Sequence, residues 1–248
     1  MKIIAHTLIK NEENFVWFAV NSIIDYVDEI LIWDQGSSDK TKEIIETIRS
    51  SKIRFCEVGG SVSSARQKML DESHGFDWIF ILDGDEIWWD EAIKNLKLKI
   101  INSAYDVVVV PNYMLVGDVF HFQEEKAGKY QIAGRTGHYN IRAIRNFPGL
   151  HLEGIYPNEA FVNKDGVKVQ DFPKEKILFY DKPYLHASFL KKRKYEIGES
   201  FPKDFYYPEV FFLPRPSIVS SPWQPMTKDY KLRASVETPL KKIKRRLL

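Results

Sequence analysis

The chain has 248 residues, of which 44% are hydrophobic and 14% aromatic, and this composition excludes an intrinsically disordered protein. Its 36 lysines and arginines nearly balance its 34 aspartates and glutamates. The resulting net charge of +2 argues against a nucleic-acid-binding protein, because such proteins carry strongly basic surfaces. The single cysteine, Cys56, excludes a disulfide framework and a zinc site of the Cys-x-x-Cys type.

The sequence carries no recognisable targeting or membrane-spanning signal. No apolar run approaches the roughly 20 residues that are needed to cross a bilayer. The N-terminus lacks the apolar stretch and small-residue cleavage site that a signal peptide requires. A chain that needs no disulfide suits a reducing compartment, so we expect a soluble protein of the cytoplasm.

The first 115 residues alternate between short apolar runs and segments with helical spacing. Apolar runs of strand length lie at residues 3–9, 29–34, 53–58, 77–83 and 106–111. Apolar residues recur at helical spacing within residues 15–26, 40–49, 62–72 and 90–102. Strands that alternate with helices predict βαβ units, a parallel sheet and helices on both of its faces.

The alternation ends after residue 116, where glycines, aromatic residues and isolated histidines predict mixed strands and long loops. Residues 201–225 carry six prolines and are therefore not expected to form a regular element. We expect a single domain over residues 1–200, made of the halves 1–115 and 116–200. Residues 201–248 are expected to form a loop rich in proline and aromatic residues and a poorly ordered basic tail.

Carboxylates gather where the predicted strands end, which is where open α/β sheets bind their ligands. Asp83 and Asp85 flank Gly84 after the fourth strand, and residues i and i+2 of an extended chain point to the same side. Gly84 lets the backbone approach a ligand closely. A divalent Mg²⁺ or Mn²⁺ bridging to a diphosphate would offset the repulsion between the two carboxylates. The alternative is an acidic turn that caps the next helix.

Four segments, in this order along the chain, resemble motifs of the family 2 glycosyltransferases, which have the GT-A fold. They are Lys10-Asn11-Glu12-Glu13, the Asp-x-Gly-Ser-x-Asp-x-Thr pattern of residues 34–41, Ser64-Ala65-Arg66-Gln67, and the stretch 81–86 that contains the Asp-x-Asp motif. The resemblance covers residues 1 to about 115 and implies an α/β protein with a Rossmann-like, mostly parallel central sheet. Two departures leave the nucleotide open: no Pro-Thr-Tyr precedes Asn11, and Gln67 replaces an asparagine.

The resemblance implies a metal-dependent enzyme that moves a sugar from a nucleotide-diphosphate sugar, foremost a UDP-sugar, to an acceptor hydroxyl. Asp34 would hold the base or ribose, and Arg66 would reach the nucleotide or its diphosphate. Asp85 would ligate Mn²⁺ or Mg²⁺ directly. The implied donor-binding residues are Thr7, Leu8, Lys10, Glu12, Asp34, Gly36, Arg66, Asp83 and Gly84.

Structural roles stay open for three of the polar residues in this half. Asp34 can cap the turn before the second helix, and Arg66 can be an ordinary solvated helix arginine. Asp39 is expected to cap the second helix rather than to contact a ligand.

Residues 151–159, which follow the basic segment 141–145, are similar to a second-half pattern of some bacterial members of the family. That pattern ends in His-Glu, and here Asn158 replaces the histidine while Glu159 keeps the glutamate. The resemblance implies that Glu159, rather than Glu153, is the general base of an inverting transfer. In the alternative, Glu159 pairs with a nearby arginine and only ties a loop to the sheet.

Residues 183–186 and 191–195 resemble the late histidine and basic segment of the same group. His186 would complete the carboxylate metal site, unless it is a satisfied structural histidine. The basic residues 191–194 would neutralise the leaving diphosphate, or form a solvated face.

Three other functions compete with the glycosyltransferase. A nucleotidyltransferase would favour a glycine-rich loop after the first strand, and residues 7–11 contain no glycine. A non-catalytic sugar-nucleotide or glycan-binding relative would be expected to lose Asp83 or Asp85. A glycoside hydrolase with two carboxylates would not explain the residues on the nucleotide side.

The acceptor is the least defined partner. A glycan, a lipid-linked sugar or a protein would serve in the synthesis of a glycan or a cell-surface polysaccharide. Residues 240–248 mix apolar and cationic side chains and are expected either to lie on an anionic membrane surface or to be a disordered tail.

Overall fold

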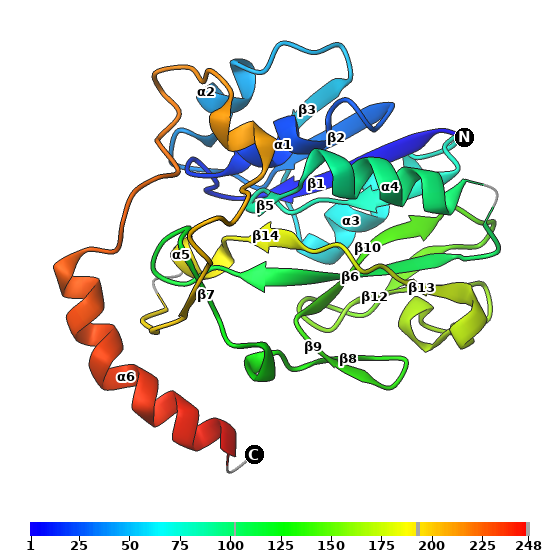
Figure 1. Ribbon diagram of the computed structural model, residues 1–248. Helices are drawn as coiled ribbons and strands as arrows, with labels where there is room; N and C mark the ends of the chain where they lie inside the picture. The colour runs from blue at the N-terminus through cyan, green and yellow to red at the C-terminus, as the bar shows by residue number, and fades with distance from the viewer. Residues whose placement is uncertain (102, 192–193, 247–248) are drawn as a thin grey trace.

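The computed structural model describes residues 1–101, 103–191 and 194–246. Its centre is one large sheet with helices on both faces, and a further helix lies at its side (Figure 1). The strands and helices of the first half follow the predicted alternation. They are β1 (Ile3–Ile9), α1 (Val16–Ile23), β2 (Glu29–Asp34), α2 (Thr41–Glu46), β3 (Ile53–Glu57), α3 (Val62–Asp71), β4 (Trp78–Ile81), β5 (Glu86–Ile87), α4 (Asp90–Ile100) and β6 (Val107–Met114).

Local sequence explains the ends of these helices. The Ser61 side chain accepts a hydrogen bond from the backbone N–H of Ser64 and so starts α3. Asp90 and Glu91 lie in the first turn of α4 and Lys97 in its last turn, as the helix dipole favours. The helix predicted over residues 90–102 ends at Ile100, and residue 102 lies outside the described part of the chain.

The central sheet has nine strands and is mostly parallel, as predicted. Its strand order is β3-β2-β1-β4-β10-β6-β14-β5, and β13 (Ile177–Phe179) pairs with β6 off this path. β10 (Tyr139–Arg145) runs antiparallel to β4 and β6, between which it is inserted. β14 (Tyr184–His186) runs parallel to β6 and antiparallel to the short β5.

This topology brings distant carboxyl ends to one edge of the sheet. β1, β2 and β4 are mutually parallel, and β6 keeps their direction because one antiparallel strand separates it from β4. β14 follows the direction of β6. The loops after β1, β2 and β4 and the end of β14 therefore meet at the edge where an open α/β sheet binds its ligand.

Two hydrophobic cores cover the two faces of the sheet. One packs α1, α2 and α4 against residues such as Ile30, Phe80 and Val108. The other packs α3 and the second-half loops against residues such as Leu31 and Val109. The central strands are buried on both faces, which explains why they read as continuous apolar runs rather than alternating ones.

Besides β10, β13 and β14 of the central sheet, the second half consists of short strand pairs, 3-10 turns and loops, in line with the mixed strands and loops predicted. β8 (Tyr130–Ile132) with β9 (Arg135–Gly137) and β11 (His151–Glu153) with β12 (Ala160–Val162) form hairpins, whereas β7 (His121–Phe122) pairs with the distant β15 (Glu199–Ser200). The remaining elements are η1 (Glu125–Ala127), η2 (Val169–Asp171), η3 (Lys174–Lys176), α5 (Ser188–Lys191) and η4 (Glu209–Phe212).

The C-terminal segment corrects the expectation of a poorly ordered tail. Residues 228–246 form helix α6 (Lys228–Arg246), the orange-to-red helix in Figure 1; residues 247–248 lie outside the described range. Ala234 and Thr238 are buried on one face of α6, so packing against the body stabilises a segment that looks only basic in sequence. No helix in the described ranges combines the length and apolar character needed to span a membrane.

Candidate active site

The loop between β4 and β5 carries Asp83, Gly84 and Asp85 to the carboxyl edge of the sheet, and Glu86 is the first residue of β5. A Cβ atom on Gly84 would lie 2.8 Å from Cγ of Glu12 and 3.0 Å from Cγ2 of Ile9. Close packing against Ile9 and Glu12 thus requires a glycine at this position. This contact fixes the Asp-x-Asp loop beside the first-strand loop.

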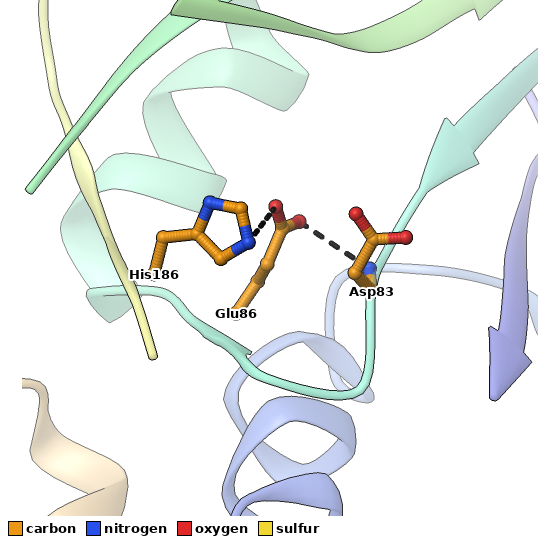
Figure 2. Close-up of side chains that lie close together, drawn as sticks. All are labelled: Asp83, Glu86 and His186. Atoms are coloured by element: carbon orange, nitrogen blue, oxygen red, sulfur yellow. Dashed lines mark hydrogen bonds and ion pairs between the residues drawn. The ribbon is translucent and has the colours of Figure 1, made fainter. Parts of the chain in front are cut away.

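His186 completes a cluster of possible metal ligands. Asp83, Glu86 and His186 each offer one ligand atom, and these atoms lie within 4.8 Å of one another. Figure 2 shows Glu86 between the imidazole of His186, from β14, and Asp83, from the loop after β4. Nε2 of His186 is 3.4 Å from Oδ1 of Asp85 and 3.9 Å from Oε1 of Glu86. The structure therefore brings together Asp85 and His186, the two predicted ligands.

Glu86 is a member of this cluster that sequence reasoning missed. Its side chain is fully buried, and burial raises the pKa of Glu86 to about 7 although the charge of Arg142 opposes the rise. The signal was a third carboxylate in residues 83–86. The spacing does not predict its role, because position i+3 of an extended chain does not share the face of i and i+2, whereas here the loop turns between β4 and β5.

Arg142 on β10 is the buried cation of the site. Its Nη2 lies 3.1 Å from Oδ2 of Asp83 and also contacts Oε1 of Glu86. Its Nε donates to the hydroxyl oxygen of Tyr184 at 3.1 Å, and the Tyr184 ring stacks on Trp88. Burial raises the pKa of Asp83, but the charges of Arg142, Arg66 and His186 outweigh it and hold that pKa below its ordinary value.

Lys191 of α5 joins the end of the chain's second half to the first-strand loop. Its Nζ donates to the carboxylate of Glu12 and, at 2.7 Å, to the backbone carbonyl oxygen of Lys10. Burial and the charge of Asp85 raise the pKa of Glu12 to about 8, against the lowering effect of Lys191. The predicted basic segment 191–194 is described only at its ends, because residues 192–193 lie outside the described ranges.

Arg66 and Glu159 lie at the α3 side of the cluster. Nη2 of Arg66 is 3.9 Å from Oδ1 of Asp83, and its Nε is 3.7 Å from Oε1 of Glu159. Oε2 of Glu159 is buried and has no hydrogen-bond partner within the described ranges. Glu159 thus makes the arginine contact of the structural alternative, and its second oxygen is left without a partner.

The loops after β1 and β2 are hydrogen-bonded to each other and form the rest of the edge. The backbone N–H of Asn11 donates to Oγ of Ser37 at 2.8 Å, and that of Glu12 donates to Oγ1 of Thr41 at 2.7 Å. Oδ1 of Asp34 accepts from the N–H and hydroxyl of Ser37, so Asp34 does cap this turn. Oδ1 of Asp39 accepts from the N–H of Thr41 at 3.0 Å, but the N-cap of α2 is Lys40, so Asp39, the expected cap, lies one residue before the cap position.

The other predicted donor-binding residues differ in accessibility. Thr7 is fully buried, and its Oγ1 has no partner in the described part of the chain. Leu8 is half-buried, whereas Lys10 is exposed at the end of β1. Gly36 is exposed with φ +77°, a left-handed conformation that favours glycine at this turn.

The charge and the donor atoms of the site suit a divalent cation. The described site contains five carboxylates and three permanently cationic side chains, and the raised pKa values of Glu12 and Glu86 reflect burial and neighbouring carboxylates. Carboxylate oxygens with one imidazole nitrogen match Mn²⁺ or Mg²⁺, which accept oxygen ligands and keep positions for phosphate and water. The carboxylates are Glu12, Asp83, Asp85, Glu86 and Glu159, and the cations are Arg66, Arg142 and Lys191.

Comparison with known proteins identifies one family from the sequence and one shared fold from solved structures. Residues 6–156 match the sequence profile of the family described as glycosyl transferase family 2. A TPR repeat-containing protein of Synechococcus elongatus is 32% identical over 90 residues, which make up 36% of this chain and 22% of that protein.

Crystal structures of S. aureus TarS share the fold. A TarS fragment has 16% identity and a TM-score of 0.52, over 78% of this chain and 63% of that one. The same fragment in complex with UDP-GlcNAc has 17% identity and a TM-score of 0.52, over 85% of this chain and 64% of that one. This chain therefore spans less than two thirds of the TarS chains and about a fifth of the cyanobacterial protein.

Proposed function

Because the chain belongs to glycosyl transferase family 2, we propose that it moves a sugar from a nucleotide-diphosphate sugar to an acceptor hydroxyl group. The observation that carries the proposal is the cluster of Asp83, Asp85, Glu86 and His186 at the carboxyl edge of the sheet. The fold relative TarS holds UDP-GlcNAc, which supports a UDP-sugar as the donor.

The four clustered residues would hold Mn²⁺ or Mg²⁺. The bound ion would offset the negative charge that develops on the departing diphosphate, the main electrostatic demand of the reaction. Arg142 prepares these ligands because its buried guanidinium favours the ionised forms of Asp83 and Glu86. Arg66 and Lys191 lie beside the cluster and would contact the diphosphate oxygens.

The donor nucleotide would lie over the joined loops after β1 and β2. Asp34 uses Oδ1 for both hydrogen bonds to Ser37, so Oδ2 would accept from a ribose hydroxyl or an imide N–H of the base. Gly36 leaves the surface of this turn open because it has no side chain. The other donor contacts would come from Thr7, Leu8, Lys10, Glu12, Arg66, Asp83 and Gly84.

Glu159 would act as the general base of a transfer with inversion. The base has to take the proton of the acceptor hydroxyl as that oxygen attacks the sugar. The carboxylates after β4 would be committed to the cation, so the base comes from another segment. Oε2 of Glu159, without a hydrogen-bond partner in the described ranges, would accept that proton.

We assign the nucleotide sugar to residues 1–115, and the acceptor and the metal to residues 116–200, of one catalytic domain. The acceptor would be a glycan, a lipid-linked sugar or a protein, in glycan or cell-surface polysaccharide synthesis in the cytoplasm. Contact with a membrane would come from α6. Its outward side chains Leu232, Val236, Leu240 and Ile243 are 56–68% exposed and recur at helical spacing.

A panel of UDP-sugars tests the proposed activity. With Mn²⁺ present, we expect one donor to release UDP, by slow hydrolysis or by transfer to an added acceptor. The Asp85→Asn variant should lose at least about 10²-fold in rate, because it removes an anionic ligand of the cation that would offset the charge on the diphosphate. Asp165→Asn, which changes an exposed aspartate in a turn of the second half, is the matched control and should keep the wild-type rate. A non-catalytic relative would bind a donor and release no UDP.

A further inference from the structure

A cavity that is separate from the proposed donor site lies beside the candidate active site. It has a volume of about 600 Å³ and lies between the loop that contains η1 and helix α6. Its floor contains Met114, Gln123 and His138. Met114 is the register partner of His186 in the pairing of β6 with β14, so the cavity begins one strand away from the proposed metal site.

The lining of this cavity is strongly cationic. Five basic side chains line it, and Glu196 is the one acidic residue among the described lining residues. Arg245 binds Glu196 through two hydrogen bonds of 2.7 and 2.8 Å, so the charge of Glu196 is already offset. The other basic side chains of the lining are those of Lys129, Lys194, Lys241 and Lys244.

Two of these lysines are available to a ligand. Lys129 and Lys244 are exposed and contact no carboxylate within the described ranges. Lys241, by contrast, donates to the carbonyl oxygen of Tyr195 and to Glu237. Nζ of Lys194 lies 3.9 Å from the centre of the Phe189 ring.

Helix α6 forms one wall of this cavity and is held in place by hydrogen bonds and packing. The hydroxyl of Tyr230 donates to the carbonyl oxygen of Lys194 and accepts from the N–H of Glu196 at 3.0 Å. The N–H of Ile197 donates to Oγ1 of Thr238 at 2.8 Å, and Ala234 is fully buried. These contacts hold Lys241, Lys244 and Arg245 of the last turns over the cavity.

We propose that this cationic cavity is the acceptor subsite and that it binds the phosphate group of a phosphate-bearing acceptor. The inference rests on the proposed transferase function, which requires an acceptor beside the donor. Lysine ammonium groups are strong point-charge partners for phosphate. The other large cavity nearby, of about 620 Å³, is lined by Glu124, Glu125, Asp181 and Glu199 against one lysine and would repel an anion.

The direct test measures the binding of fluorescent tripolyphosphate in the presence of EDTA. Under these conditions the donor site has surplus carboxylates and repels the probe, so the cavity is measured. The double variant Lys129→Gln/Lys244→Gln should weaken binding by at least about tenfold, since two charge-assisted contacts are removed. The control Lys126→Gln/Lys231→Gln changes one exposed lysine on the η1 loop and one on α6, and should bind as the wild type does.

Two further arms identify the source of the phosphate. Loss of sedimentation with phosphatidic acid vesicles in the cavity variant, but not in the control, would assign the phosphate to a lipid. Binding of tripolyphosphate by the wild-type protein, with equal sedimentation of the cavity variant and the control, would assign the phosphate to a soluble acceptor. Either result supports the subsite. Equal binding of tripolyphosphate by the cavity and control variants, or none by the wild type, would overturn it.

A separate readout keeps this inference distinct from the proposed function. UDP binding with Mn²⁺ should be the same in the cavity variant and the wild type, because neither lysine belongs to the donor site. A wild-type protein that binds no UDP but binds tripolyphosphate through the cavity lysines would contradict the proposed donor and leave the anion site standing. Thermal unfolding of both double variants checks that their folds are intact.

Discussion

Arg142 is the side chain on which the geometry of the site depends most. Arg142 is 5% exposed, and its guanidinium contacts Asp83, Glu86 and Tyr184, which come from two distant segments of the chain. Burying charged groups is favourable only when each keeps its partner. Arg142 therefore adds little to the net free energy of unfolding. Its removal would nevertheless destabilise the fold strongly, because Glu86 would be left buried without its partner.

We predict that Arg142→Met destabilises the fold by about 3–5 kcal/mol, because Glu86 is left buried without its partner. The double variant Arg142→Met/Glu86→Gln should recover a large part of that loss, since no unpaired charge remains. Urea unfolding of the two variants at one pH measures both effects. A single variant within about 1 kcal/mol of the wild type would show that Glu86 is satisfied in another way.

Replacement of Glu159 distinguishes a catalytic role of this side chain from a structural one. We expect Glu159→Gln to lower kcat by about 10²–10⁴-fold, with UDP binding and metal affinity close to those of the wild type. Glu153→Gln, at an exposed position of the same hairpin, is the control. A near-normal kcat, or a product that retains the anomeric configuration of the donor, would leave Glu159 only its contact with Arg66.

His6 makes stability depend on pH. It is 4% exposed on β1, where its Nε2 lies 2.7 Å from Oγ of Ser73. The Ser73 hydroxyl donates to the carbonyl oxygen of Met69, so neutral His6 donates from Nε2 to Oγ. Burial, and secondly the charge of Arg66, lowers the pKa of His6 to about 3.

The unfolded chain, with an ordinary histidine pKa near 6.5, binds a proton that the folded chain rejects between about pH 6.5 and 3. This contribution to stability is therefore complete above pH 6.5 and is lost as the pH falls toward 3. Urea unfolding between pH 7 and 4.5 should show the decline, and His6→Gln should reduce its slope. Parallel pH curves for the two proteins would show that His6 is accessible to protons in the folded state.

At the scale of secondary-structure elements, the sequence predicted what depends on local pattern. Parallel central strands are buried on both faces, so β1, β2 and β4 stand out as apolar runs between helices. The insertion of β10 between β4 and β6 was not predictable in this way, because strand pairing across 60 residues leaves no local periodicity. For the same reason, the sequence shows Arg142 only as part of the basic segment 141–145 and does not indicate that it contacts Asp83.

The packing of helix α6 is likewise not predictable from local sequence pattern. Its inner face is made of Tyr230, Ala234 and Thr238, which look unremarkable among many charges. These side chains stabilise the helix through contacts with residues 194–197, and the sequence alone does not indicate that the two segments are neighbours. Its outer face keeps apolar side chains in solvent, and such a face beside basic residues is typical of helices that lie on anionic membranes.

We predict that Val236→Glu/Leu240→Glu on the outer face of α6 abolishes binding to phosphatidylglycerol vesicles at low salt. The release of UDP from a soluble donor should stay unchanged, because both side chains point away from the body. Leu98→Glu, at an exposed leucine of α4 that is 60% accessible, is the control. If the wild-type protein does not sediment with these vesicles, α6 has no membrane role.

At the scale of the whole molecule, the fold gathers the proposed donor site at one edge of the sheet from both halves of the chain. The first half contributes the loops after β1, β2 and β4, and the second half contributes Arg142, Glu159, His186 and Lys191. The resemblance in the sequence predicts the donor side at this edge, and of the second-half residues it singles out Glu159, His186 and, within the basic segment 191–194, Lys191. The contacts among them follow from the sheet order, which no single segment encodes.

Binding of UDP in the presence and absence of a divalent cation tests the central claim most directly. A nucleotide at about 100 times its Kd stabilises the folded state by about 2.7 kcal/mol, which corresponds to a rise in Tm of roughly 5–10 °C for a chain of this size. We predict that rise for the wild-type protein with UDP and Mn²⁺, its loss in EDTA, and its loss in Asp85→Asn. The same Tm shift in EDTA or in Asp85→Asn, or none in the wild-type protein, would contradict a cation-dependent nucleotide-sugar site at this edge of the sheet.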